Sequence, residues 1–147
     1  QRLMNIGRFD AFLLAGRYTL LEQGGLDSFL PRCVAENVSI ILGAPFNSGI
    51  LATGAIPDAR YNYLPAPEPV MQRVAAIEEV CRGYGISLPA AALQFPLFHP
   101  AVTTVIPGSK SREEAERNVA LMTEAIPAEF WRDLRSAELI RADAPIP

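Results

Sequence analysis

Three short apolar segments, spaced along the chain, limit the fold more than any other feature of the sequence. They are residues 11–16, 38–44 and 101–106, and the first runs on into 17–21. Each has the length of a strand. None shows the alternation of polar and apolar residues that is typical of a strand with one solvent-exposed face, so we expect strands buried on both faces. Such strands occur in parallel sheets covered by helices.

Helical patterns fill most of the chain between and after these segments. Amphipathic spacing and capping residues predict five helices, the third with Ser87 as its N-cap, over 26–34, 70–81, 87–95, 111–122 and 128–140. A further stretch, 45–67, is irregular, and loops of this length in compact domains are usually binding loops or lids. The order strand–helix–strand–helix–helix–strand–helix–helix predicts an α/β fold with a parallel sheet and right-handed crossovers.

The composition indicates one packed domain. Its 147 residues suit a single domain, and 50% of them are apolar, enough for a core. The net charge of −3 argues against nucleic acid or an acidic membrane as a partner, since either needs a clustered basic excess. No apolar run approaches the roughly 20 residues that span a bilayer, and we see no leader pattern at the start.

The cysteines and the first residues add two expectations. Cys33 and Cys81 lie on the apolar stripes of predicted helices, so we expect reduced core thiols in a cytoplasmic protein. Residues 1–6 have the pattern of the end of a helix, with Gly7 as its stop, and the chain lacks an initiator Met. We therefore expect that further sequence precedes it.

The strongest local pattern is the segment 106–114. A strand ends, Gly108 lets the backbone turn, Lys110 is the only lysine, and Ser111 with Glu114 forms a capping box that opens a helix. A helix N-terminus carries a partial positive charge, so this segment suits an anion. Its spacing does not fit the GxxxxGK[ST] phosphate loop, and a purely structural capped helix is an equally good interpretation.

Other residues that could carry chemistry are scattered. His99, the only histidine, is expected to be structural or on the surface. Tyr18 follows the first strand, where α/β folds bind ligands, so we predict that it contacts substrate. Tyr61 and Tyr63 either contact a ligand or pin the irregular stretch. No metal-ligand motif occurs, and we predict no metal site.

Three ordered segments together resemble the aldo-keto reductases, and most closely their sugar and pyridoxal dehydrogenase branch: residues 12–23, 43–54 and 105–118. The resemblance implies an eight-stranded (β/α) barrel in which these segments belong to strands six, seven and eight. The chain would then be the C-terminal half of a TIM barrel, a single partial barrel domain over 1–147 with about three parallel strands. Whole barrels need roughly 250 residues, which agrees with this length.

The resemblance also implies a nicotinamide cofactor. By position, one group would cradle the pyrophosphate and nicotinamide ribose: Pro45, Phe46, Asn47, Ser48, Gly49 and Leu51. A second group would hold the adenosine ribose or its 2′-phosphate, with Asn118 at the adenine: Gly108, Ser109, Lys110 and Ser111. Many NADP-selective relatives carry Arg where Glu114 stands. Because a carboxylate there would repel a 2′-phosphate, we favour NAD over NADP.

In that family the catalytic Asp, Tyr, Lys and His come from the first four strands, and none of those motifs is present. We therefore predict no catalytic residue here and no turnover by this segment alone. In the intact oxidoreductase, hydride would pass between nicotinamide and an aldose, alcohol or aldehyde. The alternatives are a half-barrel that binds nucleotide or self-associates without catalysis, and a plain structural domain. An open half-barrel should self-associate or pair with its missing N-terminal half.

Overall fold

The computed structural model describes all residues from Gln1 to Pro147, and it contains a three-stranded parallel sheet. The strands are β1 (Ala11–Ala15), β2 (Ser39–Gly43) and β5 (Val102–Ile106), in the order β1-β2-β5. All three predicted strands and their parallel pairing are confirmed. The first strand is shorter than its apolar run, because Gly16 adopts a left-handed φ of 60° and turns the chain away.

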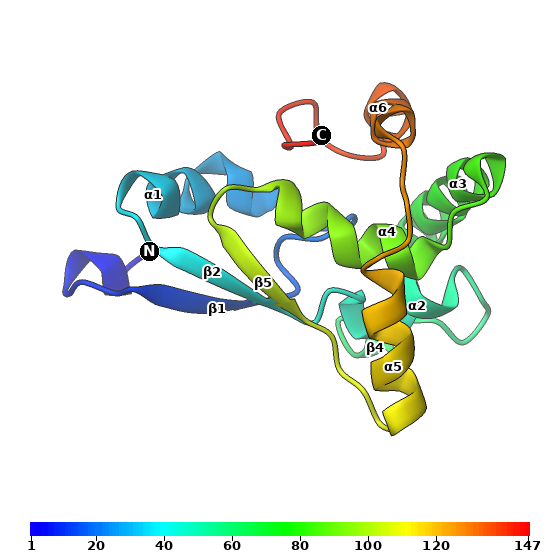
Figure 1. The fold of residues 1–147 in the computed structure, drawn as a ribbon, viewed down its shortest axis with the longest axis horizontal. Helices are drawn as coiled ribbons and strands as arrows, with labels where there is room; N and C mark the ends of the chain where they lie inside the picture. The colour runs from blue at the N-terminus through cyan, green and yellow to red at the C-terminus, as the bar shows by residue number, and fades with distance from the viewer.

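The predicted helices also form, with shifted ends. Those of five residues or more are α1 (Phe29–Ala35), α3 (Glu68–Tyr84), α4 (Leu88–Gln94), α5 (Arg112–Leu121) and α6 (Ala128–Ser136). In Figure 1, α1 and α4 lie along one face of the sheet, whereas α2 (Ile50–Thr53) and α5 lie beyond the carboxyl ends of the strands. Later in the irregular stretch, β3 (Arg60–Tyr61) and β4 (Leu64–Pro65) form a small antiparallel hairpin.

Short 3₁₀ turns complete the secondary structure. They are Leu3–Asn5, Gly24–Asp27, Asn47–Gly49 and Phe95–Phe98. The expected helix end over 1–6 is only the first of these turns. The turn at Phe95–Phe98 continues α4, because Pro96 cannot donate the hydrogen bond that an α-helix needs there.

The expectation that every strand is buried on both faces is wrong. In β1, exposed and half-buried residues alternate, and Leu13 is 65% exposed. Leu13 pairs in register with Ile41, and Ile41 with Thr104, so this row lies on the open face of the sheet. The opposite face carries the buried Ile40 and packs against the helices. The sheet therefore has one covered face and one open face.

The core lies between the covered face and the helices. Its largest fully buried side chains are aromatic and come from α6, from the turn after α4 and from the segment after β1: Trp131, Tyr18, Phe95 and Phe130. Cys33 and Cys81 are buried and free, which confirms the prediction of reduced core thiols. None of the helices combines the length and the apolarity that crossing a bilayer requires.

Candidate functional site

A cleft of about 530 Å³ opens beyond the carboxyl ends of β2 and β5. Its walls come from the segment after β2, the start of α4, and α5 with the loop before it. Half of the twelve predicted cofactor residues line it, two from the segment after β2 and four from α5 or its entry loop: Phe46, Gly49, Gly108, Lys110, Glu114 and Asn118. Two predicted segments about sixty residues apart in sequence thus meet at one concave surface.

The first wall is built by an unusual backbone. After β2 the chain passes through Asn47, Ser48 and Gly49 with φ of 46°, 63° and 105°, three consecutive left-handed residues. Phe46 closes this turn, because its carbonyl accepts hydrogen bonds from the N–H groups of Gly49 and Leu51. The turn brings Phe46 and Gly49 to the cleft and starts α2, whose Thr53 also lines it.

Four residues of the first predicted group do not line the cleft. Pro45, Asn47 and Leu51 are buried beneath it. Asn47 is fully engaged inside the protein: its Oδ1 accepts a hydrogen bond from the Thr19 hydroxyl at 2.6 Å, and its Nδ2 donates to the Gly16 carbonyl at 3.3 Å. The Ser48 hydroxyl oxygen accepts the N–H of Tyr63, which ties the β3–β4 hairpin to this wall.

The second wall is the entry to α5, where the Ser111 half of the predicted capping box forms. Ser111 Oγ accepts the Glu114 N–H at 3.2 Å. The Glu114 carboxylate turns back and accepts the Lys110 N–H at 2.7 Å, one residue before the usual partner. Asn118 Nδ2 donates to Ser109 Oγ at 3.0 Å, so both ends of the loop are held against the helix.

The charges of the cleft suit an anion. Lys110 and Arg117 line it, and neither side-chain cation takes part in any of the ion pairs of the structure. Glu114 is the only carboxylate among the lining residues, so the walls carry a net charge of +1. Two unpaired cations, with the N-terminus of α5 close to Lys110, attract phosphate groups.

Arg117 was missed by sequence reasoning, although its spacing could have revealed it. Glu114, Arg117, Asn118 and Leu121 follow the i, i+3, i+4, i+7 positions of one helix face, and all four line the cleft. Ser87, at the start of α4, also lines it. It is the N-cap residue of α4, as predicted, but its side chain makes no capping hydrogen bond, because its N–H and hydroxyl both donate to the Glu124 carboxylate at 2.8 Å.

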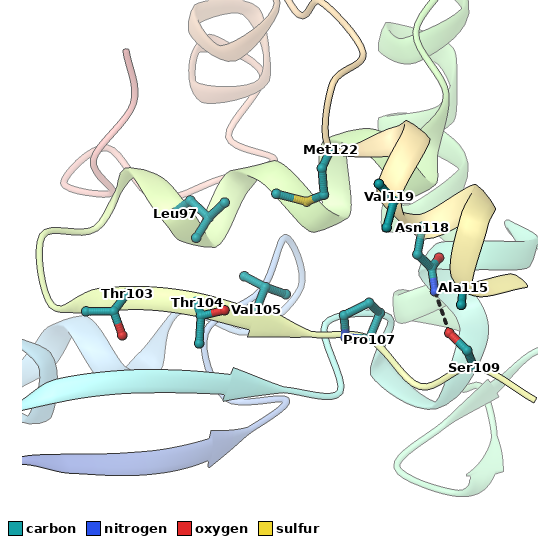
Figure 2. A pocket seen from close by; sticks show the side chains of 10 residues that line it. All are labelled: Leu97, Thr103, Thr104, Val105, Pro107, Ser109, Ala115, Asn118, Val119 and Met122. Atoms are coloured by element: carbon teal, nitrogen blue, oxygen red, sulfur yellow. Dashed lines mark hydrogen bonds between the residues drawn. The ribbon is translucent and has the colours of Figure 1, made fainter. Parts of the chain in front are cut away.

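A second pocket, of about 440 Å³, lies on the other side of Asn118, between β5, α5 and the turn after α4 (Figure 2). Leu97, Val119 and Met122 border it, and Asn118 and Ser109 stand at one end of it. No charged side chain lines this pocket. The cleft with Lys110 and Arg117 is therefore the better anion site.

Tyr18, predicted to contact substrate, lies in the core instead. It is fully buried, with its ring 5.4 Å from that of Phe95 and edge-on to His99. Burial raises the pKa of Tyr18, whose hydroxyl has no hydrogen-bond partner. The chain turns at Gly16, so Tyr18 folds back over the end of the core and no ligand reaches it in this structure.

The irregular stretch is pinned by one of its two tyrosines. The Tyr61 hydroxyl hydrogen-bonds to the Glu22 carboxylate, which Arg17 approaches to 3.3 Å. Burial and then this hydrogen bond raise the pKa of Tyr61. Tyr63, at the tip of the hairpin, is 82% exposed.

His99 has the structural role expected of it. It is 5% exposed, and its Nδ1 accepts the Ala101 N–H at 3.2 Å. Burial lowers its pKa, so the folded state favours the neutral ring. No group of three or more His, Cys, Asp and Glu residues is arranged to hold a metal ion.

A pH-dependent stability follows from the burial of His99. Because its folded pKa is below its unfolded value of about 6.5, its stabilising contribution is present above that pH and is lost as the pH falls through it. We expect the free energy of unfolding to decrease from about pH 7.5 to about pH 5.5. Denaturant unfolding of His99→Asn, which keeps an acceptor for Ala101, should lack this component. An identical pH slope in both proteins would contradict the assignment.

Comparison with known proteins identifies the family. The profile of the Aldo/keto reductase family matches residues 1–139. The chain is 40% identical over 131 residues to pyridoxal 4-dehydrogenase of Microbacterium luteolum, covering 89% of this chain and 38% of the relative. It is 38% identical over 132 residues to D-threo-aldose 1-dehydrogenase of a Pseudomonas species, covering 89% of this chain and 40% of the relative.

A solved structure shares the fold. The holo form of an aldo-keto reductase from Bacillus halodurans superposes with a TM-score of 0.73 at 19% identity, over 97% of this chain and 46% of that one. The chain spans about two fifths of the length of the two curated relatives. These similarities confirm the resemblance and the branch that the three sequence segments indicated. The chain belongs to the aldo/keto reductase family.

Proposed function

We propose that this chain is the C-terminal, cofactor-binding half of a (β/α)8 barrel in an NAD(P)-dependent oxidoreductase. The three parallel strands, the cleft at their carboxyl ends and the match to two fifths of two dehydrogenases support this assignment. Enzymes of barrel fold place their active sites at this end of the strands. The substrate class of the whole enzyme is then an aldose, alcohol or aldehyde, in line with the names of the relatives.

One observation carries the proposal: residues from the turn 46–49 and from the segment 108–118 meet at a single cleft that holds two unpaired cations. The turn at Phe46–Gly49 would receive the pyrophosphate. Lys110 and Arg117 would neutralise phosphate charge, and Asn118 would meet the adenine. When bound, the nicotinamide supplies hydride transfer, and the residues of this chain hold and orient the nucleotide.

Nucleotide titration tests the two cations. We expect Lys110→Ala and Arg117→Ala each to weaken the binding of NAD⁺ about tenfold, because each removes a charged partner of a phosphate. The measurement is isothermal titration calorimetry of the purified chain. Arg112→Ala is the matched control, since Arg112 lies on the same helix, pairs with Glu116 and does not line the cleft. Equal affinities for NAD⁺ in the unsubstituted chain and the three variants would refute the site.

The preference for NAD over NADP depends on Glu114. Its carboxylate lies in the cleft one turn from Lys110, where it would repel a 2′-phosphate and accept a hydrogen bond from a free ribose hydroxyl. We expect Glu114→Gln to raise the affinity for NADP⁺ relative to NAD⁺ in the same titration. An unchanged ratio would show that Glu114 does not set the preference.

We also infer that the proton-transfer group of the intact enzyme lies outside this chain. Lys110, Glu114 and Arg117 are the only ionisable side chains that line the cleft, and our assignment gives each of them a role in nucleotide binding. The chain alone should therefore show no turnover. The open face of the sheet, where Leu13 and Ile106 are 65% and 50% exposed, is the surface that the remaining barrel strands would cover. Without them, this apolar surface favours self-association.

A further inference from the structure

The turn that forms the first wall of the cleft is held in a conformation that most residues avoid. Asn47 and Ser48 adopt left-handed φ values and precede Gly49, which adopts a third. Asn tolerates this region better than other non-glycine residues, and a run of three needs outside support to persist. On its outer side the turn is held at Ser48, whose hydroxyl oxygen accepts the Tyr63 N–H, and on its buried side it is held at Asn47.

Thr19 provides a buried contact at that point. Its hydroxyl oxygen accepts the N–H groups of Leu21 at 3.2 Å and Glu22 at 3.1 Å. Those two bonds occupy its lone pairs, so its single proton is left for Asn47 Oδ1 at 2.6 Å. The amide of Asn47 is thereby oriented with Nδ2 toward the Gly16 carbonyl. Thr19 is fully buried and Asn47 is 4% exposed, so water does not replace these bonds.

The segment that carries Thr19 is itself anchored from behind. Gln23 Nε2 donates to the carbonyls of Thr19 and Leu20, and its Oε1 accepts the Arg141 N–H at 2.7 Å. Gln23 is 5% exposed. A chain of buried hydrogen bonds therefore leads from the C-terminal segment through Gln23 and Thr19 to Asn47.

We propose that Thr19 is a positioning residue for the nucleotide cleft, acting through the amide of Asn47 to fix the left-handed turn that receives the pyrophosphate. Thr19 touches no ligand itself. The proposal rests on the proposed function, since it assumes that the cleft binds a nicotinamide nucleotide. It assigns a role in cofactor binding to a residue that lies beneath the cleft and outside its lining.

Calorimetric titration with NAD⁺ tests the role of the hydroxyl. Thr19→Val keeps the shape of the side chain and removes the hydroxyl, so we expect about tenfold weaker binding. Thr19→Ser keeps the hydroxyl and should bind within about twofold of the unsubstituted chain. AMP, which lacks the pyrophosphate and nicotinamide, should bind Thr19→Val and the unsubstituted chain equally. A general loss of folding would instead weaken the binding of both NAD⁺ and AMP. Thermal melting of each variant checks for such a loss.

A double substitution tests the route through Asn47. Asn47→Gly removes the amide but permits the positive φ. In that background Thr19→Val should cause no further loss of NAD⁺ affinity, because its partner is already gone. An equal loss in both backgrounds, or full affinity in Thr19→Val, would overturn the proposal.

Failure of the proposed function has a different signature. An unsubstituted chain that binds neither NAD⁺ nor AMP would refute the nucleotide site itself, and with it the role of Thr19 in binding. Amide hydrogen exchange at Ser48 and Gly49 then still reports on the turn without any ligand. Faster exchange at these residues in Thr19→Val than in Thr19→Ser supports the ordering of the turn by Thr19, and equal exchange contradicts it.

Discussion

Replacement of Trp131 by Ala is expected to lower the free energy of unfolding by about 3–5 kcal/mol. Trp131 is fully buried, and its ring lies 4.9 Å from Phe130, 5.0 Å from Phe98 and 6.2 Å from Phe95. These contacts join α6 to the turn after α4. Since whole domains are stable by only about 5–15 kcal/mol, this loss is a large share of the total stability.

Chemical denaturation followed by far-ultraviolet circular dichroism measures this loss. Val119→Ala is the control, because Val119 is 69% exposed on α5 and its truncation should change stability by less than about 0.5 kcal/mol. The loss of stability in Trp131→Phe should lie between those of Trp131→Ala and Val119→Ala, since phenylalanine keeps an aromatic ring and leaves a smaller cavity. A Trp131→Ala protein as stable as Val119→Ala would show that the aromatic cluster does not hold α6 in place.

The sequence was sufficient to predict the strands, the long helices and their order. The three apolar runs became β1, β2 and β5, and the capping box at Ser111 opened α5 as expected. These features are local: a period of apolar residues or a cap depends on neighbours within one turn. The burial of β1 is not local. Exposed and half-buried residues alternate in β1 because helices cover only one face of the sheet. A short apolar run in the sequence does not show which faces of a sheet will be covered.

The cleft was predicted in outline but not in its inner support. The two segments that line it were recognised from their residues, whereas Thr19 and Gln23 look like a continuation of an apolar strand. Their partners, Asn47 and Arg141, lie 28 and 118 positions away. Thr19 within the segment 17–21 and Gln23 just after it were the available signs, and only the fold shows which groups they hydrogen-bond. Tyr18 was misplaced for the same reason, because the turn at Gly16 decides where it points.

Gly54 should be the least replaceable glycine of the chain. Its φ of 82° and ψ of −172° lie in a region that is essentially restricted to glycine. A Cβ there would lie 2.9 Å from Glu78 Cδ and closer still to its Oε1. Glu78 has little freedom to move, because its Oε2 accepts the Ala55 N–H at 3.1 Å. We expect Gly54→Ala to cost about 3 kcal/mol, from backbone strain of about 1–3 kcal/mol and the weakened hydrogen bond.

Substitutions at two other glycines separate the cost of backbone strain from the cost of contact with Glu78. Gly85 ends α3 with φ of 67° and has open space around it, so Gly85→Ala should cost only about 1 kcal/mol, the strain of a left-handed alanine. Gly83 lies within α3, also in open space, and Gly83→Ala should stabilise the protein by about 0.5–1 kcal/mol. Urea unfolding of the three variants measures the series. If Gly54→Ala costs no more than Gly85→Ala, contact with Glu78 adds nothing and the end of α2 adapts freely. A larger loss for Gly54→Ala means that the backbone after α2 is fixed, which keeps the wall of the cleft that carries Thr53 in place.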